Sequence, residues 1–298
     1  MFSTTRREVL RALGAGAGAV FAPSLARMQV RAQAPSAGMR LGAQTNAYPI
    51  DPKNFDTFLS AIGKLETIGY QGFETGYRNV MSQFASPDDA RARIAATGLT
   101  FFGIHIFLQH AMYDTATLIA PASLYEQVAK GGKSLGALYL VCSGAAAGNL
   151  DQLNVKIAGL NTAAKFCQAL GLGFAYHNEE PESGSKLNEL DILYTRTDPR
   201  TVKFLLDVGH LYNLGGDVVA FIRKHHERIV GLHIRDYKDH QQVVLGTGTL
   251  PLLDIAHTLE QLHWRGWVEC EEERLDGVKH GDEYLRPAFT ALKEAFSK

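Results

Sequence analysis

The segment from Phe174 to Glu182, FAYHNEEPE, leads from an apolar run directly into a histidine and several carboxylates. His177 and Glu179 are residue types that transfer protons and bind metal ions, and a spacing of two places them on the same side of an extended strand. An ionised carboxylate at the end of a buried strand is costly unless it is paired or bound to a metal ion. The segment therefore predicts a functional site.

Similar polar residues end other apolar segments along the chain: Glu74, His105, Asp207 with His210, His233 with Asp236, and Glu269 with Glu271. In a parallel barrel the ends of such segments meet at one mouth, where the acids repel one another unless a cation is present. We therefore expect one divalent metal ion in an incomplete shell, Mn²⁺ first, with Mg²⁺, Co²⁺ or Zn²⁺ as alternatives. A closed structural zinc site would favour thiolates instead.

The elements that position these residues are expected to be eight strands separated by helices. The strand-like segments cover residues 39–45, 72–77, 99–107, 137–144, 173–179, 202–209, 229–236 and 267–273. Between them lie amphipathic segments such as FDTFLSAIGKLETIG, with apolar residues at helical spacing. This alternation implies parallel strands, so we predict an α/β fold, a single-domain (β/α)₈ TIM barrel over residues 35–298. An open doubly wound sheet is the alternative, weakened because no G-x-G-x-x-G follows the first strand.

Residues 1–34 are expected to be a cleaved signal peptide. They combine a basic start, a weakly apolar Ala/Gly-rich core and small residues at Ala32 and Ala34 that suit a cleavage site. The Arg6-Arg7 pair resembles a twin-arginine (Tat) export signal, so we expect an exported, periplasmic protein. Cleavage after Ala26, or an uncleaved basic tail, are the alternatives.

Composition excludes several classes of partner. The net charge of the 298-residue chain is −1, with both signs interspersed, which argues against binding to nucleic acid or, after signal cleavage, to a membrane. Cys142, Cys167 and Cys270 show no C-x-x-C spacing, and an odd count in an exported protein argues against a disulfide framework. We expect all three to be free and mostly buried.

Five ordered motifs in the second half of the chain resemble the xylose isomerase-like barrel superfamily of sugar and sugar-phosphate isomerases and epimerases. They are AYHNEEPE, LLDVGH, RIVGLHIRDY, LGTGTLPL and GWVECEEE. The resemblance implies four metal ligands: Glu179, Asp207, His233 and Glu269. Many relatives read Y-H-N-H at the first motif, and this chain has Glu179 in place of the second histidine. Glu180 and Glu182 are therefore alternative ligands.

The remaining roles follow from these positions. The expected acids and bases are Glu179, Glu269 and His177, and the expected substrate contacts are Glu74, His105, His210, Arg235, Asp236 and Glu271. Three residues of the predicted site also have a structural alternative. Asp207 suits a helix cap, His233 suits a buried core histidine, and Glu271 suits an ion pair with an arginine such as Arg235. His225, His226, His240, His257 and His263 are expected to be solvated.

The resemblance implies proton abstraction next to a carbonyl, through an enediolate, by a metal-dependent isomerase or epimerase. An inosose-dehydratase-like or keto-glycoside lyase activity is the alternative on the same site, and a non-catalytic sugar-binding barrel is the alternative of another class. The export signal, and the lack of a lysine beside LGTGTL, favour a carbohydrate substrate without phosphate. Relatives often dimerise or tetramerise, so a homo-oligomer is also an expectation.

Overall fold

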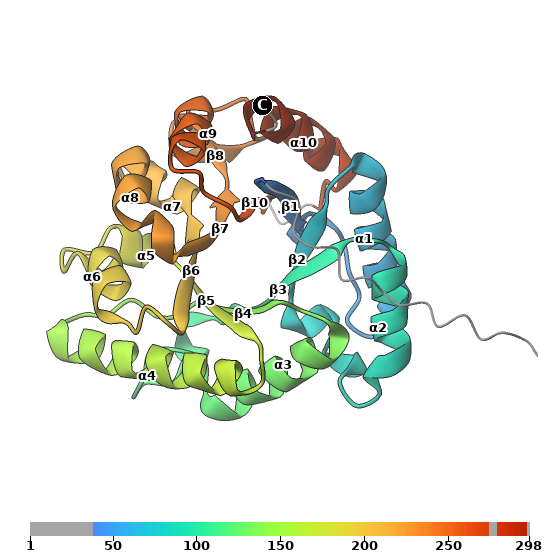
Figure 1. The fold of residues 1–298 in the computed structure, drawn as a ribbon, viewed down its shortest axis with the longest axis horizontal. Coiled ribbons are helices and arrows are strands. Elements are labelled where there is room, and N and C mark those ends of the chain that lie inside the picture. The colour runs from blue at the N-terminus through green and yellow to red at the C-terminus, as the bar shows by residue number, and fades with distance from the viewer. Residues whose placement is uncertain (1–37, 274–278, 297–298) are drawn as a thin grey trace, which may run out of the picture. The chain divides into compact units, whose positions relative to one another are not determined.

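The computed structural model describes residues 38–273 and 279–296, and within these ranges eight parallel strands close into a barrel (Figure 1). The strand order around the barrel is β1-β10-β7-β6-β5-β4-β3-β2. The strands are β1 (Arg40–Gln44), β2 (Gly72–Gly76), β3 (Thr100–Ile106), β4 (Tyr139–Cys142), β5 (Gly173–His177), β6 (Val202–Asp207), β7 (Ile229–Ile234) and β10 (Trp267–Cys270). The predicted (β/α)₈ barrel is confirmed. The predicted signal peptide lies outside the described residues.

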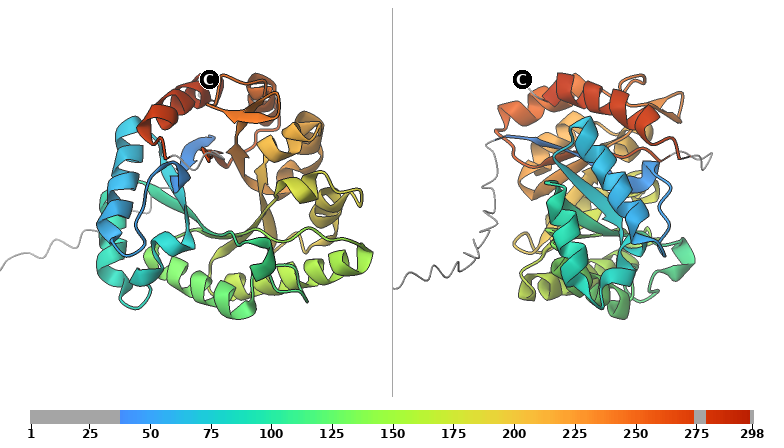
Figure 2. Two further views of the ribbon diagram at one scale, coloured as in Figure 1. Left: turned by 180° about the vertical axis from the view of Figure 1, so that it is seen from behind. Right: turned by 90° about the vertical axis from the view of Figure 1, so that its right-hand side faces the viewer.

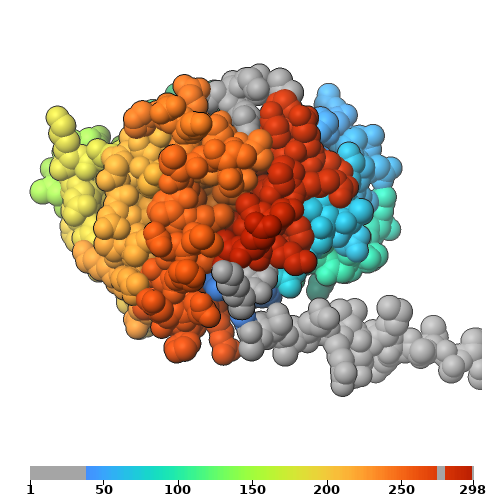
Figure 3. All heavy atoms as spheres, turned by 90° about the horizontal axis from the view of Figure 1, so that it is seen from above, coloured from blue at the N-terminus to red at the C-terminus, as the bar shows by residue number. Residues whose placement is uncertain are grey.

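Helices form a ring outside the strands (Figures 1 and 2). They are α1 (Phe55–Ile68), α2 (Pro87–Ala96), α3 (Ala122–Leu135), α4 (Leu150–Ala169), α5 (Glu180–Ser183), α6 (Glu189–Arg196), α7 (Val208–Asn213), α8 (Val218–His225), α9 (Leu252–Gln261) and α10 (Asp282–Phe296). Single 3-10 turns cover Thr45–Ala47, Tyr77–Asn79, Met81–Gln83, His110–Met112 and His226–Arg228. Helices α9 and α10 contact each other on the surface (Figure 3).

The predicted helix FDTFLSAIGKLETIG illustrates why these segments are helical. The side chain of Asn54 caps the N-terminus of α1 by accepting the N–H of Asp56, and Gly69 ends the helix at a φ of 116°. Phe58, Ile62 and Leu65 have no exposed surface, because their helical spacing turns them toward the strands. Burial of this stripe fixes the helix against the barrel.

An apolar layer fills the interior of the barrel on the side where the strands begin. It consists of Phe102, Val141, Ala175, Leu205 and Trp267. The polar side chains of the same strands come later in the chain, toward the C-terminal ends. The layer therefore forms the floor of the barrel, and the mouth is left for polar chemistry.

Two details differ from the sequence-based expectations. The seventh predicted strand stops at Ile234, and an antiparallel hairpin of β8 (Asp236–Lys238) and β9 (Gln241–Val243) follows it. His225 is buried rather than solvated, because its ring packs against Tyr194 and Phe221, and its Nε2 lies 2.8 Å from Asp191 Oδ1. The three cysteines are free and buried, as predicted. Among the described residues, no helix combines the length and the apolar character needed to cross a bilayer.

Candidate metal centre and active-site cavity

A cavity of about 260 Å³ opens at the C-terminal ends of the strands. Its lining comes from the ends of β1, β2, β3 and β5 and from the segments that follow β1, β2, β3, β5, β6, β7 and β10, as expected for an α/β barrel. The lining residues are Gln44, Asn46, Gly76, Tyr77, Arg78, Asn79, His105, Phe107, His177, Glu179, His210, Arg235, Glu271 and Glu273. Of the residues predicted to form the site, His105, His177, Glu179, His210, Arg235 and Glu271 line the cavity.

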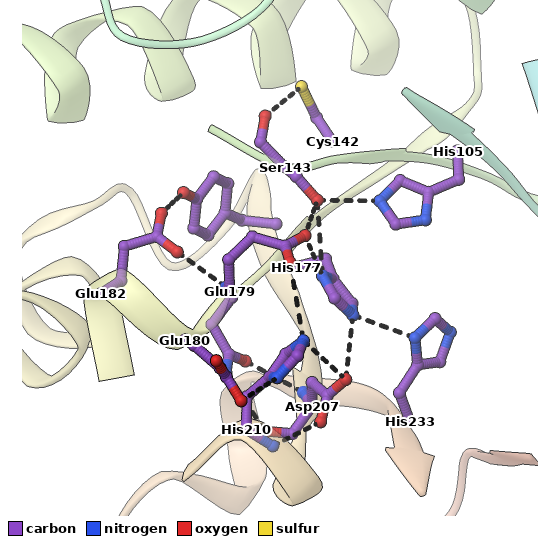
Figure 4. Close-up of polar contacts among 12 residues, drawn as sticks. His105, Cys142, Ser143, His177, Glu179, Glu180, Glu182, Asp207, His210 and His233 are labelled. Carbon is purple, nitrogen blue, oxygen red and sulfur yellow. Dashed lines mark hydrogen bonds and ion pairs between the residues drawn. The ribbon is translucent and has the colours of Figure 1, made fainter. Parts of the chain in front are cut away.

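Four buried side chains at the floor of this cavity bring potential ligand atoms within 4.8 Å of one another: His177, Asp207, His233 and Glu271. His177 and Asp207 are the last residues of β5 and β6, and Glu271 follows β10 directly. Nε2 of His177 lies 2.9 Å from His233 Nδ1 and 3.6 Å from Asp207 Oδ2 (Figure 4). The same nitrogen lies 3.7 Å from Glu271 Oε2. The four residues form one compact set of two imidazoles and two carboxylates.

This set differs from the predicted quartet at two positions. Asp207 and His233 belong to it, whereas Glu179 and Glu269 are replaced by His177 and Glu271. Glu179 lies beyond the end of β5, because that strand stops at His177. Glu269 comes two residues before Glu271 and points to the same side of the strand, so its side chain lies deeper in the barrel. The sequence signal that could have favoured Glu271 is its later position in the predicted strand 267–273, closer to the barrel mouth.

A second group lies below the first and shares one histidine with it. His233 Nε2 lies 3.4 Å from Glu74 Oε1 and 3.8 Å from Glu269 Oε2, and all three side chains have no exposed surface. A carboxylate behind a metal-binding imidazole orients the ring and selects its tautomer. Glu74 is not among the residues that line the cavity and lies behind His233, which differs from the substrate contact predicted for it.

Glu269 is isolated in this lower group. Neither of its carboxylate oxygens has a hydrogen-bond partner among the described residues. Burial, and next the negative charge of Glu74, raise the pKa of Glu269 well above its usual value. This environment favours the protonated acid, and no part of Glu269 lines the cavity. Glu269 forms with Glu74 and His233 a second group whose potential ligand atoms lie within 4.8 Å of one another, so its roles as ligand and as acid or base stay predictions.

The two oxygens of Asp207 have separate partners. Oδ1 accepts the backbone N–H of His210 at 2.8 Å and so caps α7, while Oδ2 lies 2.8 Å from Arg235 Nε. Asp207 therefore caps a helix and also belongs to the group of potential ligands. Arg235 also contacts Glu271, with Nη2 2.8 Å from Oε2, as the ion-pair alternative expected. One guanidinium thus orients both carboxylates of the group.

The histidines of the site are strongly perturbed. Burial lowers the pKa of His177, but hydrogen bonds to Asp207, Glu179 and Glu271 outweigh burial and raise that pKa well above its usual value. For His233, burial is likewise outweighed by the charges of Glu271 and Glu74, which raise its pKa to about 10. The raised pKa values mean that the negative charges of these carboxylates favour protonated imidazoles at both positions.

The donor set fits a divalent metal ion. His233 Nδ1 faces His177 Nε2 and also contacts Glu271 Oε2, so nitrogen and oxygen donors of separate strands converge on one point. Two imidazoles and two carboxylates are the donors of catalytic zinc sites and of other borderline divalent ions. A cation at this point would replace the protons held by the histidines.

Sequence reasoning missed Ser143, which directly follows β4 and connects several polar residues (Figure 4). Its Oγ lies 2.8 Å from Glu179 Oε1 and 2.9 Å from His105 Nε2, and His105 Nδ1 lies 2.9 Å from Glu74 Oε1. The hydroxyl of Ser143 and the imidazole of His105 thus connect Glu179 with Glu74. The signal was present, since Ser143 lies near the end of the predicted strand 137–144, but serine was not among the residue types considered for the site.

Glu179 and His210 form the accessible acid–base pair of the cavity. His210 Nε2 lies 3.5 Å from Glu179 Oε2. Burial raises the pKa of Glu179, but hydrogen bonds to His177 and His210 reverse this and hold it well below its usual value. Burial lowers the pKa of His210, and the charge of Asp207 more than compensates, giving a pKa of about 9. The cavity thus presents an ionised carboxylate beside a protonated imidazole.

Asp236 lies away from the cavity, which corrects its predicted substrate contact. Its carboxylate accepts the backbone N–H groups of Gly246 at 3.0 Å, Gly248 at 2.8 Å and Leu250 at 2.9 Å. A Cβ at Gly248 would lie 2.2 Å from Asp236 Oδ1, so the close approach requires glycine. The motif LGTGTL is a loop wrapped around one carboxylate.

Comparisons with known proteins agree with this architecture. The chain is 30% identical over 155 residues to the inosose dehydratase of Halalkalibacterium halodurans, which covers 46% of this chain and 51% of the relative. The chain thus spans about half the length of the curated relatives it matches. The 3-keto-D-glucoside 4-epimerase YcjR of E. coli superposes with a TM-score of 0.67 at 15% identity, covering 86% of this chain and 99% of that one.

The IOLI protein, solved with a bound zinc atom, superposes with a TM-score of 0.69 at 14% identity. The match covers 87% of this chain and 100% of the IOLI chain. At these identities the structural likenesses concern the fold. The model of one family, however, matches residues 62–294, which is most of the chain. This protein belongs to the xylose isomerase-like TIM barrel family.

Proposed function

We propose that this chain is a divalent-metal-dependent isomerase or epimerase of a sugar or keto-sugar. The observation that carries the proposal is the convergence of His177, Asp207, His233 and Glu271 within 4.8 Å at the floor of the cavity. The Glu179–His210 pair lines the same cavity, so ligands and acid–base groups face one substrate volume. Membership of a family with isomerase, epimerase and dehydratase relatives supports the same class of chemistry.

The ion would be held by His177, Asp207, His233 and Glu271. When bound, a divalent cation supplies Lewis acidity, which polarises the oxygens of a hydroxy-ketone and acidifies the C–H between them. Glu74 and Arg235 orient the ligands from outside, since each contacts one or two of them. The two imidazoles shift our preference from Mn²⁺ toward Zn²⁺ or Co²⁺, because imidazole suits these ions better than Mg²⁺.

Glu179 is the proposed base. Its carboxylate is ionised, lines the cavity and is held by Ser143. It would take the proton from the carbon next to the carbonyl. Protonated His210 would donate a hydrogen bond to the substrate oxygen on which negative charge develops. Delivery of a proton to the opposite face of the same carbon by a second group would complete epimerisation, and delivery to the neighbouring carbon would complete isomerisation.

Dehydration is the second candidate, and a specific observation favours it. A base beside a protonated imidazole, 3.5 Å apart, suits elimination, because one group takes the C–H proton and the other protonates the departing hydroxyl. The inosose dehydratase of H. halodurans is the relative with this chemistry in its name. The same residues would serve both reactions, and the substrate decides between them.

The proposal includes a substrate without phosphate and an exported, periplasmic protein. The twin-arginine-like motif at Arg6-Arg7 supports export, and no lysine of the described residues lines the cavity. Arg78 at the cavity mouth donates from Nη1 to the carbonyl oxygen of Phe107 at 3.3 Å and lies over the Tyr77 ring, and it is the group we expect to meet a charged substituent. Comparison of phosphorylated and neutral sugars of the same configuration tests this part separately.

The decisive experiment is solvent deuterium exchange. We expect the metal-loaded protein to incorporate deuterium next to the carbonyl of at least one sugar in a panel of free ketoses, inososes and 3-keto-glycosides. Chelation should abolish the exchange, because the ligand group then holds protons in place of the metal. Loss of water from the substrate would favour the dehydratase. A protein that binds a sugar from the panel without exchange would instead be the sugar-binding barrel.

A further inference from the structure

A fully buried ion cluster lies beside the candidate site, on the helix side of β5. Nζ of Lys156 on α4 lies 2.6 Å from Glu182 Oε1, 2.8 Å from Glu189 Oε1 and 2.7 Å from the carbonyl oxygen of Ala145. The side chains of the lysine and both glutamates have no exposed surface. None of these residues contributes to the cavity lining in the described part of the chain.

The cluster is stable only because every charged atom has a partner. A buried ammonium needs acceptors for its three N–H bonds, and Lys156 has three. The second oxygens of the two carboxylates are also used. Glu182 Oε2 accepts the backbone N–H of Glu179 at 2.7 Å, and Glu189 Oε2 accepts that of Ala147 at 2.9 Å. One lysine therefore connects the loop after β4 with the start of α5.

These two segments carry the partners of the proposed base. Ser143 belongs to the loop after β4, and Glu179 directly precedes α5. The hydrogen bond from Ser143 Oγ to Glu179 Oε1, 2.8 Å long, exists only while both segments keep their spacing. Glu182, an alternative metal ligand from the sequence, lies apart from His177 and His233 in Figure 4, and its Oε1 contacts Nζ of Lys156.

We propose that Lys156 is a positioning residue, which fixes the carboxylate of Glu179 over the cavity floor through Glu182. The inference rests on the proposed function only in so far as its test by kcat requires the protein to catalyse the deuterium exchange described above. It assigns a role to the last glutamate of N-E-E-P-E, and it separates that role from metal binding, because the cluster touches none of the four candidate ligands.

Glu182→Gln is the main test. Lys156 and the N–H of Glu179 contact different oxygens of Glu182, and glutamine replaces one of these oxygens by an NH2 group, which is a donor and cannot accept. We expect kcat for deuterium exchange to fall by about tenfold to a hundredfold, the typical cost of displacing a catalytic group by about 1 Å. KM and metal affinity should stay close to wild type. A wild-type kcat in the folded, metal-loaded variant would overturn the proposal.

Lys156→Met supplies a second variant, and Asp191→Asn a matched control. Lys156→Met should lower kcat at least as much as Glu182→Gln. If it fails to fold, Glu182→Gln decides alone. Asp191 belongs to a separate ion cluster with Lys224 and His225 on α8, so its substitution should leave kcat unchanged.

A readout without substrate separates this inference from the proposed function. In the metal-loaded protein, the backbone N–H of Glu179 is expected to exchange slowly with solvent deuterium, since it is bonded to Glu182. Glu182→Gln should accelerate exchange of the peptide around residues 178–184, whereas Asp191→Asn should not. Absence of turnover in the wild type would reject the function, and unchanged amide exchange in Glu182→Gln would reject the positioning role.

Discussion

His177 and Glu179 are two residues apart, yet they have different roles in the site. β5 ends at His177, so this side chain points into the barrel mouth with the other ligand atoms. Glu179 follows the strand, and its carboxylate contacts Ser143 and His210. The length of the strand is therefore the reason why we propose His177 as a metal ligand and Glu179 as the group that transfers protons.

Substitution at these two positions tests the assignment. His177→Ala should weaken metal binding by at least about a hundredfold, because it removes a nitrogen donor from the group. Glu179→Gln should retain the metal and lose turnover, because the amide keeps the shape but cannot act as a base. Metal content after dialysis and calorimetric titration measure both effects. The reverse pattern would restore Glu179 as the ligand of β5.

The glutamates of the last strand give a second, independent pair. Glu271→Gln should weaken metal binding, whereas Glu269→Gln should keep it, because Glu269 lies in the lower group and is held in its neutral form. Both substitutions conserve the volume of the side chain. A difference in metal affinity between the two variants would therefore come from the loss of the carboxyl group at one level of the barrel and not at the other. Equal metal loss in both variants would contradict the two-layer arrangement.

At the scale of elements, the loop at residues 244–250 depends on one side chain. Asp236→Ala would leave the N–H groups of Gly246, Gly248 and Leu250 without their acceptor, so we expect a loss of roughly 2–4 kcal/mol in the free energy of unfolding. Chemical denaturation measures this loss. Metal affinity should change little, because Asp236 lies outside the ligand group.

Glu260→Ala is the control for this prediction, since Glu260 is exposed on neighbouring α9. It should change the free energy of unfolding by less than about 0.5 kcal/mol. An Asp236→Ala protein as stable as the control would mean that water replaces the carboxylate in the loop.

The strands of the barrel could be predicted from the sequence, because buried parallel strands are short apolar runs bounded by helices. The depth of a side chain inside the barrel could not. Alternation places Glu269 and Glu271 on the same face, and only the register with the neighbouring strands separates their levels. The hairpin β8–β9 was also missed, because its short, polar strands lack an apolar pattern.

Residues outside the site motifs escape the same reasoning. Ser143 contacts Glu179 and Lys156 contacts Glu182, but neither residue belongs to a motif that indicates catalysis. Lys156 lies within a helix whose pattern only predicts burial of one face. Its role depends on acceptors contributed by Ala145 and Glu182, which only the folded chain brings together.

For the molecule as a whole, the site makes stability depend on pH. The pKa values of His210 and His233 are about 9 and about 10 in the metal-free fold, above about 6.5 in an unfolded chain. A raised pKa stabilises the fold fully below the unfolded value, and the contribution is lost as pH rises through the folded value. The metal-free protein should therefore lose stability between about pH 7 and about pH 10.

Metal binding should show the opposite trend, because it requires His233 to be neutral. The increase in Tm caused by the metal should therefore grow with pH over the same window. Thermal unfolding with and without a chelator, across a pH series, measures both trends. A metal-free Tm that rises with pH would contradict the raised pKa values.

The closing strand pair joins distant parts of the polypeptide. β1 pairs with β10, with Arg40 opposite Trp267, so the first barrel strand finds one of its neighbours only after most of the chain has been synthesised. A nascent chain that lacks β10 therefore exposes two unpaired sheet edges, which invite association between molecules. We therefore expect the barrel to be protected from such association only once β10 has been synthesised and paired with β1, which is the order of events that the proposed twin-arginine route would allow.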